Sequence, residues 1–281
     1  LYDLISNGAN IVAIDEPDIH LHPSSQRSLA RLLKNGKNQK IIATHSSDIV
    51  SAFDAEHIVS VKINGKVVQP ARGLLNNDQR LILTWWVKDK LEPLTARRIV
   101  FVEGLSDRII LERVAELTGR ELDRLGVTIM EVGGCKNMKH VWSLFGKNGF
   151  DIPASILIDE DAIPDVPRYL NIQQDEFERN SVWVSLKDLE DEYVQALDRN
   201  AFVHELLSSN MFETKKQQEL ENKFKNGVIT DEDIAEFCRF KPKRHPNHKV
   251  AAASIVRQLL DDCSASRIKS IMDLLNDIES A

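Results

Sequence analysis

Four short apolar runs alternate with helical segments between residues 97 and 194, and this alternation constrains the fold more than any other feature of the chain. The runs are RIVFV, VTIMEV, ASILI and SVWVSL. After the first run, Ile110, Val114 and Leu117 recur at helical spacing, and Gly119 is placed to end that helix. Strands that alternate with helices form a parallel, doubly wound sheet, so we predict an α/β fold. Its ligand site should lie beyond the carboxyl ends of the strands.

Carboxylates follow three of these apolar runs. Glu103 comes directly after the first run, and Asp107 falls in the first turn of the next helix. Asp159 and Asp161 follow the third run, two residues apart, so they project to the same side of an extended chain. The fourth run leads into an acidic helix start that contains Asp188, Glu190, Asp191 and Glu192.

Strand ends are neighbours in a parallel sheet, so these acids should crowd one edge. Like charges that close repel unless cations lie between them. Carboxylate oxygens in that number suit Mg²⁺ or Mn²⁺. Two such ions, roughly 3.5–4 Å apart, would be able to flank a phosphodiester. A helix N-terminus decorated with acids would explain Asp107 or Glu190 singly, but it would not explain acids at strand ends.

The order VEGLSD, a strand ending in Gly133-Gly134, and then DED resembles the Toprim domain over about residues 97–192. The resemblance implies a Rossmann-like sheet and a metal-dependent catalytic site. Carried over residue by residue, it makes Glu103, Asp107, Asp159 and Asp161 metal-binding, catalytic acids. Glu190 is our choice for the last acid, with its acidic neighbours as alternatives.

A second acidic pair lies near the start of the chain, in IVAIDEPDIHLHP. Asp15 is placed to hold Mg²⁺, and Glu16 to orient and deprotonate a water. A second apolar run begins the segment IIATHS, and His45 in this segment would sense a γ-phosphate. These segments resemble the Walker B, D-loop and switch-histidine segments of ABC-type ATPases. The Walker A pattern and the signature helix are absent, so we expect negligible ATP hydrolysis by this chain and an ATP requirement only in a full-length protein.

An ABC-type segment followed by a Toprim segment resembles the OLD (overcoming lysogenization defect) family, which includes the nuclease of Gabija phage-defence systems. The resemblance implies a cytoplasmic, Mg²⁺- or Mn²⁺-dependent DNA endonuclease, joined in the full protein to an ATPase through which it dimerises. Its biological role, phage defence or repair, stays open. We predict an ATPase fragment (1–60), a connector with a hairpin at Asn64-Gly65 (61–96), a Toprim domain (97–195) and a helical domain (196–281).

The densest basic stretch connects two helical segments at 236–249. It is predicted to bind DNA phosphates through Arg239, Lys241, Lys243 and Arg244. The family resemblance also implies a lysine near the metals, where it would stabilise developing phosphorane charge. Lys249 is the candidate, with Lys243 and Lys136 as competitors. The alternative for the whole stretch is a solvated surface loop.

Composition bears on whether the chain binds DNA, spans a membrane, or contains a zinc site or disulfides. The net charge of −7 does not exclude DNA binding, because carboxylates that hold metal ions count as negative. No apolar run approaches the roughly 20 residues that span a bilayer. Cys135, Cys238 and Cys263 lie far apart, which disfavours a zinc site or disulfides and fits a reducing cytoplasm.

Three other functions are less consistent with the sequence than a nuclease. A non-hydrolytic Toprim module that binds metal or a partner for a DNA-repair ATPase is the main alternative, and intact motif acids disfavour it. A topoisomerase would need a tyrosine nucleophile in a winged-helix context, and none of the three tyrosines has one. A primase would need a zinc module that these cysteines do not supply.

Overall fold

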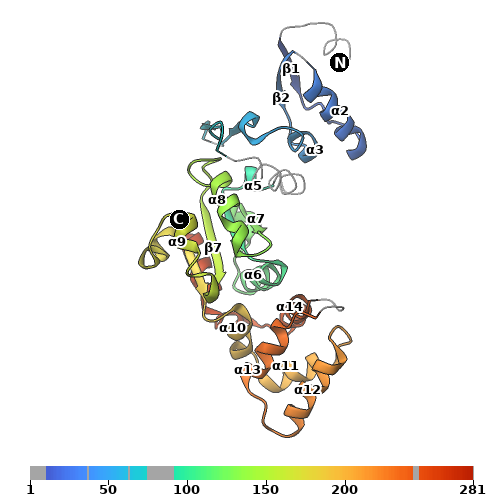
Figure 1. The fold of residues 1–281 in the computed structure, drawn as a ribbon, viewed down its shortest axis with the longest axis vertical. Coiled ribbons are helices and arrows are strands. Elements are labelled where there is room, and N and C mark those ends of the chain that lie inside the picture. The colour runs from blue at the N-terminus through green and yellow to red at the C-terminus, as the bar shows by residue number, and fades with distance from the viewer. Residues whose placement is uncertain (1–10, 37, 63, 75–91, 243–246, 281) are drawn as a thin grey trace. The chain divides into compact units, whose positions relative to one another are not determined.

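The computed structural model describes residues 11–36, 38–62, 64–74, 92–242 and 247–280 (Figure 1). The chain divides into two compact units. One comprises Leu1–Ala96 with His140–Ile152, and the other comprises Arg97–Lys139 with Pro153–Ala281. In the described residues, no helix is long and apolar enough to cross a membrane.

The first unit contains a two-stranded parallel sheet of β1 (Ile11–Asp15) and β2 (Gln39–Ala43). The helix α2 (Pro23–Asn35) connects them, and its Ala30 and Leu33 are buried. Next come α3 (Ser47–Val50) and the short helix η1 (Ala55–His57). The predicted hairpin is confirmed, because β3 (Ser60–Val61) and β4 (Val67–Val68) pair antiparallel. Residues 75–91 of the predicted connector lie outside the described residues, and α5 (Glu92–Thr95) lies at its end.

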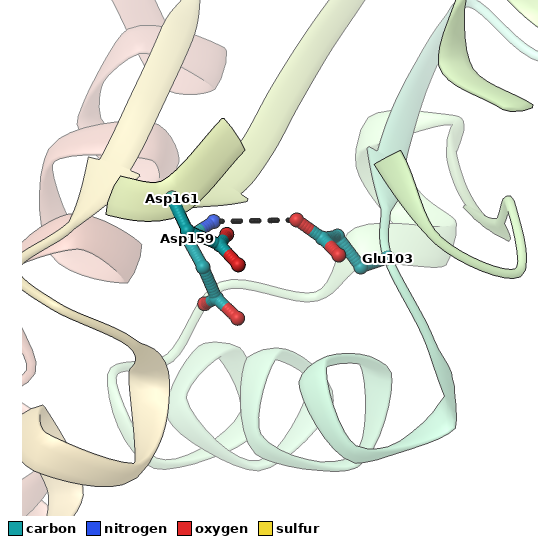
Figure 2. A group of neighbouring side chains, drawn as sticks. All are labelled: Glu103, Asp159 and Asp161. Carbon is teal, nitrogen blue, oxygen red and sulfur yellow. Dashed lines mark hydrogen bonds between the residues drawn. The ribbon is translucent and has the colours of Figure 1, made fainter. Parts of the chain in front are cut away.

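The second unit is built on four parallel strands, as the sequence predicted. They are β5 (Arg98–Val102), β6 (Val127–Glu131), β7 (Ala154–Asp159) and β8 (Val182–Ser185), in the order β6-β5-β7-β8. The winding direction reverses between β5 and β7, and open parallel sheets bind ligands beyond the strand ends at such a point. Glu103 and Asp159 lie there, with their side chains at the same edge (Figure 2).

Helical segments connect these strands. After β5 come α6 (Leu105–Leu117) and α7 (Leu122–Leu125); after β6 come η2 (Cys135–Asn137) and α8 (Met138–Phe145). Between β7 and β8 lie η3 (Glu160–Ala162), α9 (Val166–Leu170), η4 (Gln174–Glu176) and η5 (Glu178–Asn180). Gly119, with φ +75°, follows α6 closely, which confirms the predicted stop.

Beyond β8, the described residues form helices and the loops between them, with no strand. The helices are α10 (Leu189–Ala196), α11 (Arg199–Ser208), α12 (Thr214–Lys225), α13 (Asp231–Arg239), α14 (His248–Leu259), α15 (Asp262–Ala265) and α16 (Lys269–Ser280). The α16 helix packs against β7 and β8, and α14 packs against α6.

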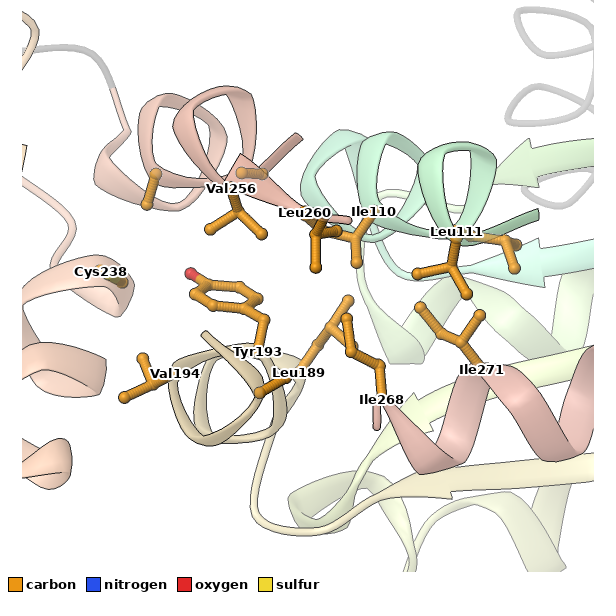
Figure 3. Close-up of a cluster of buried hydrophobic side chains, with 14 of the residues drawn as sticks. Ile110, Leu111, Leu189, Tyr193, Val194, Cys238, Val256, Leu260, Ile268 and Ile271 are labelled. Carbon is orange, nitrogen blue, oxygen red and sulfur yellow. The ribbon is translucent and has the colours of Figure 1, made fainter. Parts of the chain in front are cut away.

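One continuous group of buried apolar side chains joins the sheet to these helices. Figure 3 shows Ile110 of α6 near Leu260, and Leu111 near Ile271 of α16. Tyr193 of α10 extends the same group toward Val256. The predicted domain boundary at residue 195 therefore crosses a shared core, and it stays a prediction.

Candidate metal centre

Three carboxylates converge beyond the ends of β5 and β7. Glu103 follows β5, Asp159 ends β7 and Asp161 lies in η3. One carboxylate oxygen from each lies within 4.8 Å of the other two (Figure 2). The backbone N–H of Asp159 donates to Glu103 Oε1 at 3.5 Å, so the end of β7 helps to orient Glu103. Three acids predicted from two separate motifs are thus brought together.

Asp107 lies in the first turn of α6 and is buried. Its Oδ2 accepts from the backbone N–H of Gly104 at 2.9 Å, and its Oδ1 accepts from the Ser106 hydroxyl at 3.2 Å. The carboxylate therefore caps the helix. Burial raises the pKa of Asp107, and Lys249 partly opposes that rise, so the group lies in the electrostatic field of the same site.

Glu190 and Lys249 meet on the other side of Asp159. Lys249 Nζ lies 2.9 Å from Glu190 Oε2 and 3.6 Å from Asp159 Oδ2. The Glu190 side chain is 1% exposed, so this ion pair is largely screened from water. The backbone N–H of Leu189 donates to Asp159 Oδ1 at 3.3 Å, which ties the start of α10 to the end of β7.

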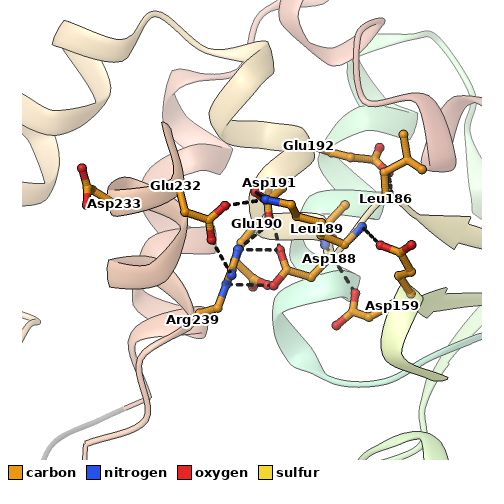
Figure 4. A network of polar contacts seen from close by, with 12 residues as sticks. Asp159, Leu186, Asp188, Leu189, Glu190, Asp191, Glu192, Glu232, Asp233 and Arg239 are labelled. Carbon is orange, nitrogen blue, oxygen red and sulfur yellow. Dashed lines mark hydrogen bonds and ion pairs between the residues drawn. The ribbon is translucent and has the colours of Figure 1, made fainter. Parts of the chain in front are cut away.

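The acidic neighbours of Glu190 have different partners. Asp188 and Asp191 form ion pairs with Arg239 (Figure 4). Glu192 accepts hydrogen bonds from the backbone N–H groups of Leu186 and Ser270. Within this acidic stretch, Glu190 alone has a described contact with Lys249, and this distinguishes it from the alternatives.

Burial makes this edge electrostatically unusual. It raises the pKa of Glu103 to about 7, with further increases from Asp159 and Asp107. It raises the pKa of Asp159 to about 6 and that of Glu190 to about 7, although Lys249 opposes both rises. For Lys249, burial lowers the pKa, but Glu190 and Asp159 more than offset it and the pKa lies above its usual range.

One lysine therefore does not neutralise the crowded carboxylates. Opposite charge nearby favours the ionised form of an acid, and a divalent cation among these oxygens would supply it. Carboxylate oxygens are hard ligands of the kind that Mg²⁺ and Mn²⁺ prefer. The donor set thus fits the predicted ions.

The prediction did not include two residues beside this edge. Glu160 lies between Asp159 and Asp161, and its Oε2 accepts from the backbone N–H of Lys187 at 2.9 Å. Because β7 ends at Asp159 and Glu160 begins η3, strand periodicity in the sequence did not signal this contact. Cys135 lies close enough to be affected by Glu103; burial first, and then that carboxylate, raises the pKa of its thiol to about 12.

Arg239, the first residue of the predicted DNA-binding group, forms ion pairs within the protein. The guanidinium pairs with Asp188, Asp191 and Glu232. The predicted contact of Arg239 with DNA stays a prediction. Lys241 is exposed. Lys243 and Arg244 lie outside the described residues.

The ATP-related residues of the first unit also meet. Asp15 pairs with Ala43 at the ends of β1 and β2. The Nε2 atom of His45 lies 3.5 Å from Glu16 Oε1, so the acidic and histidine motifs are in contact. Their role with ATP stays a prediction.

Residues 94–161 match the family described as "Overcoming lysogenization defect protein-like, TOPRIM domain". This segment is an OLD-like Toprim domain. Residues 3–50 match the family described as "AAA ATPase domain", which supports the predicted ATPase segment ahead of the Toprim domain. Both matches agree with the order of segments inferred from the motifs.

Two curated relatives of the chain are named as nucleases. The chain is 30% identical over 158 residues to "Endonuclease GajA" of Bacillus cereus, covering 54% of this chain and 26% of that protein. It is 27% identical over 166 residues to "OLD nuclease" of Thermus scotoductus, covering 54% of this chain and 31% of that protein. The chain therefore spans less than a third of the length of these relatives.

The fold matches a solved structure beyond the Toprim domain. The C-terminal region of the Burkholderia pseudomallei OLD protein has a TM-score of 0.52 and 23% identity. The alignment covers 66% of this chain and 98% of that chain. It confirms the predicted α/β fold with a helical C-terminal part.

Proposed function

We propose that this chain is the nuclease part of a Mg²⁺- or Mn²⁺-dependent DNA endonuclease, joined in a longer protein to an ABC-type ATPase. The observation that carries the proposal is the convergence of Glu103, Asp159 and Asp161 at the switch point of the Toprim sheet. The names of the relatives, an endonuclease and a nuclease, support it.

Five carboxylates would hold the metal ions. Glu103, Asp159 and Asp161 form the close group, and Asp107 and Glu190 would complete a site for two ions. When bound, two divalent ions supply an activated water and stabilise the leaving oxygen of a phosphodiester. The Leu189 N–H holds Asp159, and the Gly104 N–H holds Asp107, so both carboxylates are oriented before ions bind.

Lys249 would stabilise negative charge on the phosphate during cleavage. Its ammonium lies between Glu190 and Asp159, within the acidic edge rather than on an outer surface. A cation held there would act on charge that develops in the transition state, where water is largely excluded. Exposed Lys241, together with Lys243 and Arg244, would add sequence-independent attraction for DNA.

The organisation of the longer protein follows from the same assignment. Asp15, Glu16 and His45 would serve an ATP site completed by other parts of that protein, which would dimerise through its ATPase domain. A domain division at residues 60, 96 and 195 and a cytoplasmic location remain part of this proposal. The three free cysteines support the location.

Cleavage of supercoiled plasmid tests the proposal. The chain is incubated with Mg²⁺, Mn²⁺, Ca²⁺ or EDTA, beside Asp159→Ala and the control Asp123→Ala, which removes an exposed carboxylate of α7. We expect nicking with Mg²⁺ or Mn²⁺, none with EDTA, and loss of nicking in Asp159→Ala alone. Equal cleavage by wild type and Asp159→Ala, or no cleavage with any ion, would falsify the nuclease proposal for this chain.

A further inference from the structure

The first turn of α10 carries acids that pair in two directions. Asp188 and Asp191 pair with Arg239, the last residue of α13 (Figure 4). Glu190, which precedes Asp191, pairs with Lys249 of α14. The orientation of this single turn therefore determines whether Glu190 faces Asp159 and Lys249.

Arg239 neutralises the acids on the outer side of that turn. Its Nε lies 2.9 Å from Asp188 Oδ2, its Nη2 pairs with Asp191, and its Nη1 lies 3.3 Å from Glu232 Oε1. The side chains of Asp188 and Asp191 are only 14% and 7% exposed, so water cannot easily replace the guanidinium. Without it, Lys187 would still contact Asp191, at 3.7 Å from Nζ to Oδ1, but Asp188 would lose its described cation and the two poorly hydrated carboxylates would repel each other.

The inner side of the same segment is tied to the end of β7. The Leu189 N–H donates to Asp159 Oδ1, and the Lys187 N–H donates to Glu160 Oε2 at 2.9 Å. The Glu160 N–H donates in turn to the Lys187 carbonyl at 3.0 Å. Glu190 thus lies between an anchor on β7 and an anchor on α13.

Resting on the proposed function, we propose that Arg239 is a positioning residue for the metal centre, holding the first turn of α10 so that Glu190 faces Asp159 and Lys249. The planar guanidinium suits this task, since its fork contacts several carboxylates at fixed angles, which a lysine ammonium does not reproduce. Arg239 acts through Asp188 and Asp191 and does not itself contact the close group of acids.

Direct measurement of Mn²⁺ binding tests this role without depending on cleavage. The full chain is titrated with Mn²⁺ by calorimetry, with Arg239→Gln, Arg239→Lys and Glu190→Gln beside wild type. The matched control is Arg199→Gln. It removes an exposed ion pair between α11 and the first residue of α13, in which Arg199 Nη2 lies 2.7 Å from Asp231 Oδ1.

We expect Arg239→Gln to raise the Kd for Mn²⁺ by up to about 10-fold, the lower end of the effect of losing a direct partner of a metal ligand, because Arg239 acts through Asp188 and Asp191. Arg239→Lys should fall between wild type and Arg239→Gln, and Arg199→Gln should bind as wild type does. An unchanged Kd in Arg239→Gln, with a raised Kd in Glu190→Gln, would overturn the positioning role.

If Arg239→Gln does not fold, Asp188→Asn provides the same test. Asparagine keeps an oxygen for the Asp191 N–H, which Asp188 accepts at 3.0 Å, but it loses the charge that pairs with Arg239. A raised Kd in Asp188→Asn supports the proposal, and a wild-type Kd contradicts it. If the wild-type chain binds Mn²⁺ but does not cut DNA, only the proposed nuclease function is contradicted. The comparison of Kd values still tests the positioning role of Arg239.

Discussion

The acids at the end of β1 and those at the ends of β5 and β7 arise from the same local pattern, an apolar strand that runs into carboxylates, but their surroundings differ. In the two-stranded sheet of the first unit, Ile11 and Ile41 are each 61% exposed. In the four-stranded sheet of the second unit, Ile99 and Phe101 are fully buried, since β5 lies between β6 and β7. The same pattern therefore has two physical outcomes.

Burial explains the chemical difference. The partner of Glu16 is His45, whose side chain is 85% exposed and remains hydrated. Around Glu103 the covered sheet excludes water, and burial is the largest cause of its raised pKa. A parallel sheet covered on both faces provides this environment, whereas a strand pair with exposed faces does not.

The largest expected difference between the two acidic pairs is in DNA cleavage. We expect Glu103→Ala to lower plasmid cleavage with Mn²⁺ by more than about 100-fold, because even the partners of metal ligands contribute about 10- to 100-fold. Glu16→Ala should leave cleavage unchanged, since its partner in the described contacts is His45. Equal losses in both variants would show that the two regions act as one site.

The second prediction compares the two sheets through their stability. Ile99→Ala should lower the free energy of unfolding by about 2–5 kcal/mol, since it leaves a cavity in a filled core. Ile41→Ala should change it by less than about 0.5 kcal/mol, as for other exposed positions. Urea unfolding followed by circular dichroism measures both. A large loss in Ile41→Ala would indicate that this face is covered in solution.

The smallest expected effect is on the pH dependence of stability without metal. The pKa values of Glu103 and Asp159 in the folded chain, about 7 and about 6, lie above the ordinary values of 4.5 and 3.8. The folded state therefore binds these protons more tightly than the unfolded state does, and stability falls as pH rises through that window. Thermal unfolding in EDTA between about pH 4 and 8 should show a falling midpoint.

One variant and one ion provide the controls for this pH effect. Glu103→Gln should flatten the decline, because it removes one of the shifted groups. Added Mn²⁺ should stabilise the chain most at high pH, where the carboxylates are ionised. A midpoint in EDTA that rises across the whole window contradicts the assigned shifts.

Local pattern was sufficient for much of the fold and for part of the candidate site. The run RIVFV coincides with β5, and the hairpin at Asn64-Gly65 formed where its turn residues placed it. Glu103, Asp159 and Asp161 converge because parallel strands end at one edge, and this rule requires only the order of strands and acids. These features depend on periodicity over a few residues.

Local sequence pattern did not predict which residues the acids of α10 contact. Four acids follow one another closely at 188–192, and helical spacing alone does not say which face meets the sheet. Arg239 was predicted to bind DNA because it lies in a basic stretch, yet its nearest charges are Asp188 and Asp191, about 50 residues earlier in the chain. Long-range packing of α10 against α13 makes that contact.

By itself, the sequence determined which segments form the buried parallel strands of this protein and that carboxylates follow the ends of these strands. Only the tertiary structure decided which acids share a site, because burial, raised pKa values and the pairing of Glu190 with Lys249 depend on segments far apart in the chain. The physical reason is that periodicity acts over one helical turn or one strand, whereas desolvation and ion pairing act across the whole packed core.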